Sequence, residues 1–260
     1  MNKKIVHLSF DLEEFDTPKE YGVEISDKDM FDISIEGTRN ILKIINKYKA
    51  RSTFFTTVNF ARRIPDEIND IINYGHELAS HGVFHSGVSI PQLLESREAL
   101  EEISGKKILG FRAPRMGALS IEEVKKAGYA YDSSLNPCFI PGRYNKFSAH
   151  RNIHKDNDVY IVPASVSPVV RIPLFWLTFH NFPLSIYKML CRSTIEKDGH
   201  IVLYFHPWEF TNLHKPELKM PYIIKNNCGE KMIERLSNLI EYLAKYYDFA
   251  PICENKRLSL

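Results

Sequence analysis

Short apolar segments alternate with amphipathic segments along the whole chain. Residues 5–10 form an apolar run that ends in acidic residues, as a buried strand does when it ends at a site. Residues 34–48 place apolar side chains close to the 3.6-residue period of a helix. Further strand patterns lie at 52–58, 77–80, 108–112, 129–132, 159–162 and 199–205, and further helical patterns at 66–74, 89–105, 120–128 and 230–247. This alternation predicts an α/β fold of repeated βα units around a mainly parallel sheet.

Two of the predicted helices carry clear start signals. Ser89 is followed three residues later by Gln92, and Ser120 by Glu123, which is the spacing of a capping box. Residues 136–158 show the weakest periodicity, so we expect a long loop over the site there.

Composition and charge narrow the class of protein. The 260 residues are 44% hydrophobic and 25% charged, which is typical of a globular chain. The 34 basic residues nearly balance the 32 acidic ones, so nucleic acid is not an expected partner. Since α/β barrels routinely reach about 250 residues as one unit, we expect a single domain over residues 1–260.

Several features indicate a cytoplasmic protein without a membrane span. Asp11 interrupts the apolar N-terminal run before a secretory segment of about 7–15 apolar residues can form, so no signal peptide is expected. The longest apolar stretch, near residues 174–177, is far shorter than the roughly 20 residues that cross a bilayer. The four cysteines form no CxxC pair, which argues against a thiolate zinc site or a redox motif and favours reduced thiols.

Three clusters of ionisable residues follow predicted strands, at 11–14, 81–85 and 206–209. Barrels of βα units build active sites at the carboxyl ends of their strands. His81 and His85 can present two imidazoles to one metal ion if the backbone between them makes a single helical turn, and a carboxylate would complete the set. Asp11 and Glu13 lie two apart on a strand and project to the same side, so one can bind the metal while the other acts on a water molecule.

Four motifs carry a resemblance to a known family. They are residues 9–14 (SFDLEE), 75–85 (GHELASHGVFH), 110–114 (GFRAP) and 203–209 (LYFHPWE). With these motifs in this order, the chain resembles the polysaccharide deacetylases, the NodB-homology family of metal-dependent carbohydrate esterases (carbohydrate esterase family 4). The resemblance runs through nearly the whole length, and it implies a distorted (β/α) barrel of about seven parallel strands.

The resemblance also implies a metal site. Its ligands would be Glu13, His81 and His85. The commonest first motif has two adjacent aspartates, whereas here leucine takes the second place and two glutamates follow. Strand alternation favours Glu13 as the carboxylate ligand, and Glu14 remains the alternative. Zinc suits two histidines and a carboxylate, and Co²⁺, Ni²⁺, Mn²⁺ or Fe²⁺ can occupy such a site.

The same resemblance assigns the acid and base. Asp11 would be the general base, Arg112 would orient it, and His206 would be the general acid. In the family, a further aspartate supports the catalytic histidine, and this chain has no clear counterpart of it. Asp132 is a weak candidate that can equally cap a turn. Trp208 fits sugar stacking and core packing equally well. The seven other histidines lack matching spacing and are assigned structural or surface roles: His7, His76, His150, His154, His180, His200 and His214.

Together these features predict a metal-dependent hydrolase that removes the N-acetyl group from an amino sugar. The substrate would be an N-acetylated sugar, an oligosaccharide or a glycan precursor, nucleotide-linked or lipid-linked if the protein stays in the cytoplasm. One alternative keeps the fold and cleaves a C–N bond of a small amide or ureide. The other is a catalytically inactive carbohydrate-binding protein, against which the six intact site residues argue.

Overall fold

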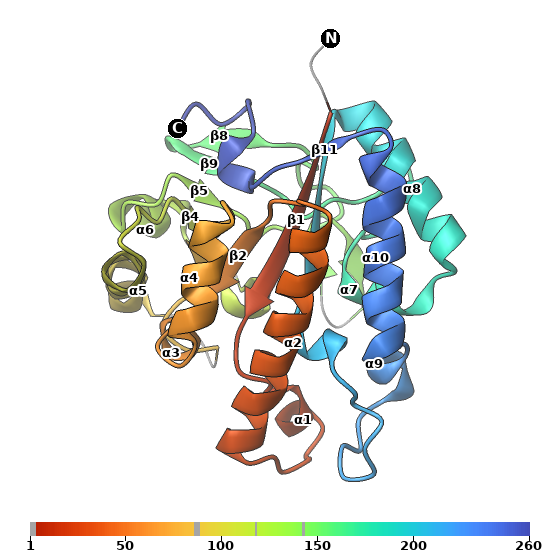
Figure 1. Ribbon diagram of the computed structural model, residues 1–260. Helices are drawn as coiled ribbons and strands as arrows, with labels where there is room; N and C mark the ends of the chain where they lie inside the picture. The colour runs from red at the N-terminus through yellow and green to blue at the C-terminus, as the bar shows by residue number, and fades with distance from the viewer. Residues whose placement is uncertain (1–3, 86–88, 118, 142–143) are drawn as a thin grey trace.

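The computed structural model describes residues 4–85, 89–117, 119–141 and 144–260, and Figure 1 shows their arrangement. The strands are, in chain order, β1 (Ile5–Leu12), β2 (Thr53–Thr56), β3 (Glu77–Ser80), β4 (Gly110–Phe111), β5 (Tyr131–Asp132), β6 (Phe139–Ile140), β7 (Tyr144–Asn145), β8 (His154–Asp156), β9 (Val159–Ile161), β10 (His200–Phe205) and β11 (Asp248–Phe249). The helices are α1 (Thr17–Glu20), α2 (Asp27–Lys47), α3 (Val58–Ala61), α4 (Pro65–Asn73), α5 (Ile90–Ser104), α6 (Ile121–Lys126), α7 (Trp176–Asn181), α8 (Leu184–Asp198), α9 (Tyr222–Lys225) and α10 (Glu230–Ala244).

One curled sheet organises the molecule. Its strand order is β10-β1-β2-β3-β4-β5-β9-β8, with β11 also paired to β1. Every neighbour from β10 to β9 is parallel, and β8 is antiparallel to β9. Beyond β9, the backbone N–H of Ser165 donates to the carbonyl of Val202 at 3.0 Å, and its hydroxyl accepts from the Val202 N–H at 2.8 Å. This contact draws the far end of the sheet back to β10, and the predicted distorted barrel of about seven parallel strands is confirmed.

The alternation of side chains along β1 separates an outer core from the barrel interior. Val6, Leu8 and Phe10 are fully buried in the large apolar cluster that includes residues of the surrounding helices. The residues between them belong to the opposite face because side chains of a strand alternate. This period of two carries Asp11 to the inner face at the carboxyl end of β1.

The amino end of the barrel is filled by the end of the chain. Ile252 and Leu258 join the small inner cluster that contains Phe55 of β2. His7 places Nδ1 at 2.7 Å from the carbonyl of Ala250, and its Nε2 accepts from Asn255 at 2.8 Å. With this end closed, the open end lies where the strands finish.

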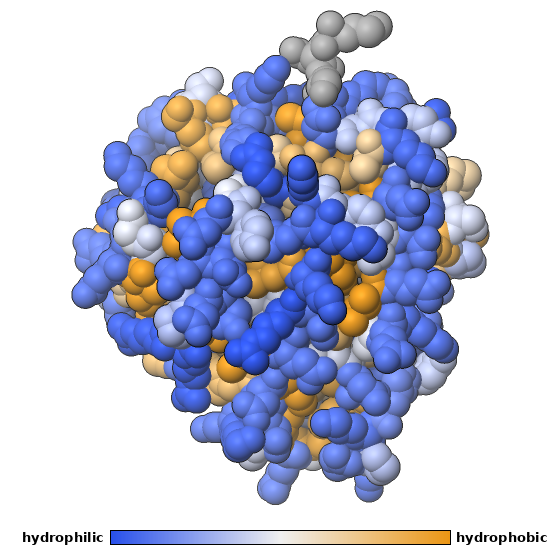
Figure 2. Space-filling view, viewed as in Figure 1, coloured by the Kyte–Doolittle hydropathy of each residue, from blue (hydrophilic) through white to orange (hydrophobic). Residues whose placement is uncertain are grey.

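The outer helices present polar faces to solvent. α2 and α10 each bury one apolar stripe against the sheet, and the face that carries them is largely hydrophilic in Figure 2. Among the described residues, no helix is both long enough and apolar enough to cross a membrane.

The structure differs from the sequence predictions most clearly in the following elements. α2 begins at Asp27, seven residues before the predicted helix, because Ser26 caps a polar first turn. α7 and α8 were not predicted, since exposed apolar residues such as Met189 blur the period of α8. The predicted loop at 136–158 contains the β6–β7 pair and β8 within its described part.

Candidate active site

The carboxyl ends of β1, β3 and β10 and the chain after β4 meet in one pocket. Among its lining residues are Asp11, Glu13, His81, His85 and His206. The structure therefore brings together side chains from three motifs that lie far apart in the sequence. Arg112 lies fully buried directly behind Asp11.

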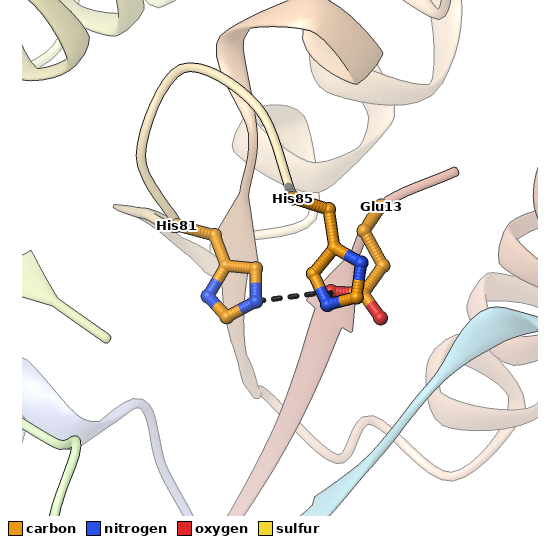
Figure 3. Close-up of side chains that lie close together, drawn as sticks. All are labelled: Glu13, His81 and His85. Atoms are coloured by element: carbon orange, nitrogen blue, oxygen red, sulfur yellow. Dashed lines mark hydrogen bonds and ion pairs between the residues drawn. The ribbon is translucent and has the colours of Figure 1, made fainter. Parts of the chain in front are cut away.

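Glu13, His81 and His85 form a compact cluster (Figure 3). One carboxylate oxygen of Glu13 lies 3.0 Å from Nε2 of His81 and 3.1 Å from Nε2 of His85. The candidate donor atoms of the three residues lie within 4.8 Å of one another, and all three residues are buried. The backbone from His81 to His85 is a loop with Gly82 at φ 83°, so the two imidazoles come together without the single helical turn that was considered for this spacing.

The outer nitrogens of both imidazoles are already engaged. Nδ1 of His81 lies 2.8 Å from the backbone carbonyl of Arg112, and Nδ1 of His85 lies 2.8 Å from the carboxylate of Asp16. Because these acceptors engage Nδ1, the Nε2 atom of each ring faces Glu13, and a bound cation would take the place of any proton there, which is the usual arrangement of metal-binding histidines. The donor set thus fits a divalent cation in its atoms, its orientation and its outer hydrogen bonds.

The electrostatics of the cluster favour positive charge. Burial lowers the pKa of His85, but the carboxylates of Glu13 and Asp16 outweigh burial and raise that pKa to about 9. Asp16 is held in turn by Arg115, whose guanidinium lies 3.1 Å from it. Neither Asp16 nor Arg115 was singled out from the sequence, since neither lies in the motif positions that carry the resemblance.

Glu13 and Glu14 occupy different environments. Glu13 follows the last residue of β1 and still points to the inner face, where it reaches both imidazoles. Glu14 is outside the cluster, and its Oε2 is a buried atom without a hydrogen-bond partner among the described residues. Strand alternation therefore extends one residue beyond the strand, as the sequence predicted.

Asp11 and Arg112 form a buried ion pair. Nη1 of Arg112 lies 2.6 Å from Asp11, and Arg112 also donates to the hydroxyls of Ser9 and Ser133 at 3.0 Å each. Its guanidinium lies 4.0 Å from the centre of the Phe55 ring. Burial raises the pKa of Asp11, but the Arg112 charge, with smaller contributions from nearby histidines, outweighs it and holds that pKa below its ordinary value.

His206 faces Asp11 across the pocket. Its Nε2 lies 3.9 Å from Asp11, and its Nδ1 lies 3.0 Å from Oε1 of Glu209, a residue with no exposed surface. Burial lowers the pKa of His206, but the hydrogen bond to Glu209 and the surrounding carboxylates raise it above its ordinary value. Its ring also stacks on Trp208, with centres 5.3 Å apart.

Glu209 is the partner that sequence reasoning missed. It follows His206 by three residues in the 3-10 turn Pro207–Phe210, a capping-box spacing that was the available signal. Asp132 instead accepts from the backbone N–H and hydroxyl of Ser134, as a residue that caps a turn does. Burial raises the pKa of Asp132 to about 6.

The comparison with known families bears directly on this arrangement. The polysaccharide deacetylase family description matches residues 1–131, just over half of the 260-residue chain. The chain belongs to the polysaccharide deacetylase family. A peptidoglycan deacetylase of Helicobacter pylori is 29% identical to it over 108 residues, which cover 38% of this chain and 37% of that relative.

Solved structures show the same fold as this polysaccharide deacetylase family member. A protein from Pseudomonas aeruginosa PAO1, described as a probable polysaccharide deacetylase, aligns with a TM-score of 0.64 at 14% identity over 95% of this chain and 86% of its own. An allantoinase aligns with a TM-score of 0.61 at 15% identity over the same fractions. At such identities these likenesses concern the fold alone.

The family match and the geometry are complementary. Residues 1–131 include Asp11, Glu13 and the paired histidines, but they end before His206. The parallel register of β1 and β10, in which Phe10 pairs with Phe205, brings His206 to the same end of the barrel as Asp11. The C-terminal half of this deacetylase family member thus completes a pocket whose other residues lie in the matched part.

Proposed function

We propose that this polysaccharide deacetylase family member hydrolyses the N-acetyl group of an amino sugar with the help of a divalent metal ion. The observation that carries the proposal is the arrangement of Asp11 and His206 on either side of a pocket that also holds the Glu13, His81 and His85 cluster. A base, an acid and a metal-ligand set in one pocket are the parts that amide hydrolysis requires.

Glu13, His81 and His85 would hold the ion, for which zinc is the first choice and Co²⁺, Ni²⁺, Mn²⁺ or Fe²⁺ are alternatives. When bound, the ion polarises the acetyl carbonyl and lowers the pKa of water, the two forms of help that an acetamide needs. Glu13 would contribute one negative charge, and the two imidazoles, neutral once they bind the ion, would contribute none.

Asp11 would remove the proton from the attacking water. Arg112 keeps this carboxylate ionised and fixes its orientation, since the guanidinium is itself held by Ser9 and Ser133. A C–O bond to the acetyl carbon then forms while the C–N bond breaks. A buried carboxylate without Arg112 would hold its own proton and could not act as a base near neutral pH.

His206 would donate the proton that the departing nitrogen needs. Its Nδ1–H bond to Glu209 leaves Nε2 as the nitrogen that faces the pocket, and the Glu209 carboxylate stabilises the protonated ring. After the amine leaves, return of the proton from Asp11 to His206 restores both groups, and acetate and the free amino sugar are the products.

The substrate we propose is an N-acetylated sugar within a glycan, an oligosaccharide or a glycan precursor. Aromatic walls support a sugar: Trp176, Tyr204 and Trp208 line the pocket beside His206. All four cysteines are free and three are buried, which supports a reducing compartment such as the cytoplasm. A nucleotide-linked or lipid-linked precursor would be available there.

The test is release of acetate from a panel of nucleotide-linked, lipid-linked and oligomeric N-acetyl sugars, with metal-loaded and chelator-treated protein. A second panel of small amides and ureides tests the alternative that the shared fold with an allantoinase raises. Metal-dependent acetate release that Glu13→Gln removes is the expected result. Turnover of a ureide alone would favour the alternative, and sugar binding without any metal-dependent product would mean a carbohydrate-binding protein.

A further inference from the structure

The carboxylate of Glu209 bridges two buried imidazoles. Its Oε1 lies 3.0 Å from Nδ1 of His206 and also accepts the backbone N–H of His206. Its Oε2 lies 2.9 Å from Nε2 of His180, and neither Glu209 nor His180 has exposed surface. Each oxygen of this carboxylate therefore serves a different histidine.

The tautomer of His180 follows from its surroundings. Its Nδ1 is buried and has no hydrogen-bond partner among the described residues. A buried N–H without an acceptor is costly, whereas an unused lone pair costs less, so the ring carries its proton on Nε2 and donates it to Glu209. His180 is thus a hydrogen-bond donor aimed at one oxygen of the carboxylate.

We propose that His180 is a positioning residue for proton donation by His206. By holding Oε2 of Glu209, it fixes Oε1 opposite Nδ1 of His206, so that Nε2 of His206 is the nitrogen that exchanges protons with the substrate. This inference rests on the proposed function, in which His206 protonates the departing amine. His180 itself does not line the substrate pocket and acts only through Glu209.

The need for a second donor comes from burial. Burial raises the pKa of Glu209, and the hydrogen bonds from His180 and His206 outweigh it and keep that pKa below its ordinary value. A buried carboxylate that loses the only donor to one of its oxygens takes up a proton or turns toward the remaining donors. Either change weakens the acceptor that holds the proton on Nδ1 of His206.

The packing around His180 prevents the ring from moving away. Trp176 meets the rings of His180 and His206 edge-on, with centres 5.6 Å apart in both cases. The backbone carbonyl of His180 accepts from Asn227 at 2.6 Å, which ties the end of α7 to the chain after α9. The indole of Trp176 therefore packs against both histidine rings.

Two substitutions of His180 separate the effect of losing the hydrogen-bond donor from the effect of losing side-chain volume. His180→Gln keeps an N–H that can reach Glu209, whereas His180→Leu fills similar space without a donor. His76→Leu is the matched control, because His76 is another buried histidine that bonds Ser52 and Asn46 instead. Urea unfolding of each variant identifies any general loss of the fold.

Turnover is measured on the best N-acetyl sugar and on an acetate ester with an activated leaving group. For His180→Leu we expect kcat to fall about 10–100-fold on the sugar, as for other outer-shell partners, with little change in KM or on the ester. His180→Gln and His76→Leu should stay close to wild type. Equal losses on both substrates, or a His180→Gln variant as poor as His180→Leu, would overturn the inference.

Proton NMR gives a readout that does not depend on turnover. The low-field resonance of the His206 Nδ1 proton, assigned by its absence from His206→Gln, should persist in His180→Gln and be lost or displaced in His180→Leu. An unchanged resonance in His180→Leu refutes the inference. Failure of the proposed function appears separately, as a wild-type protein that releases no acetate.

Discussion

Replacement of Arg112 by methionine separates the charge of this residue from its bulk. The guanidinium is fully buried, lies 2.6 Å from Asp11 and is held by two serine hydroxyls. The variant leaves the Asp11 carboxylate buried without its main counter-charge. The Arg112 charge then no longer opposes the effect of burial, so the pKa of Asp11 rises. The backbone carbonyl that accepts from His81 is unchanged, so the metal-ligand cluster should keep its orientation.

Removal of one partner from a buried ion pair costs about 3–5 kcal/mol in the free energy of unfolding. For a chain of this size, each kcal/mol lowers Tm by roughly 2–4 °C, so the variant should melt roughly 6–20 °C below wild type. The wild-type pKa of Asp11 is depressed, so the stability from the pair is present above the pKa of an ordinary carboxyl group and is lost as the pH falls through the folded value. In the variant, burial raises the pKa of the unpaired Asp11 carboxyl, so this group takes up a proton and loses its penalty as the pH falls. The difference between the two proteins should therefore be largest near neutral pH, should narrow toward pH 4 as the variant's carboxyl is protonated, and should narrow further below pH 4 as the wild-type pair is lost.

The assays are urea unfolding across pH, metal content, and the pH profile of kcat/KM for acetate release. Arg112→Met should retain metal, and its acidic limb should move to higher pH, so that activity partly recovers in alkaline buffer. The double variant with Asp11→Asn is the control, because it removes both charges and should be more stable than Arg112→Met alone. An unmoved acidic limb with wild-type stability would refute the role given to the ion pair.

Three further predictions concern single residues. Glu13→Gln should lose metal by elemental analysis while Glu14→Gln retains it, and the reverse result would place Glu14 in the cluster. His206→Ala should keep metal and lose about 10²–10⁴-fold in turnover of an acetamide sugar but far less on an activated ester, and equal losses would remove its acid role. His7 is buried with a pKa of about 4, so it stabilises the fold above pH 6.5 and this contribution is lost as the pH falls toward 4. His7→Gln should therefore reduce the acid-dependent loss of unfolding free energy by about 3 kcal/mol, and an unchanged pH dependence in urea unfolding would contradict this.

The sequence contains strong information about the strands and less about the partners of the site residues. The alternation of β1 sends Asp11 and Glu13 to one face, and this is a local property that a single segment determines. The contact between His180 and Glu209 joins segments 29 residues apart through a helix whose apolar pattern is short, so no local period could predict it.

Asp16, the hydrogen-bond partner of a candidate metal ligand, is another residue whose contact no local pattern predicts. It lies close in sequence to Glu13 but bonds His85, which lies in the loop after β3, and Asp16 also pairs with Arg115. Arg115 adopts a left-handed backbone conformation at φ 55°, which is rare for a residue other than glycine. Motif spacing predicts the candidate metal ligands, whereas the outer hydrogen bonds depend on loop conformations that have no periodic signature.

The pairing of β1 with β10 has a consequence for how the chain folds during synthesis. Ile5 pairs with His200, so one edge of the first strand stays open until most of the chain has left the ribosome. Pairing over such a sequence separation is slow, and an open strand edge can capture other chains in the meantime. The three candidate ligands all lie within the first 85 residues, whereas the histidine opposite them arrives with β10. The nascent chain therefore contains the whole candidate ligand set well before it contains the side chain that faces Asp11 across the pocket.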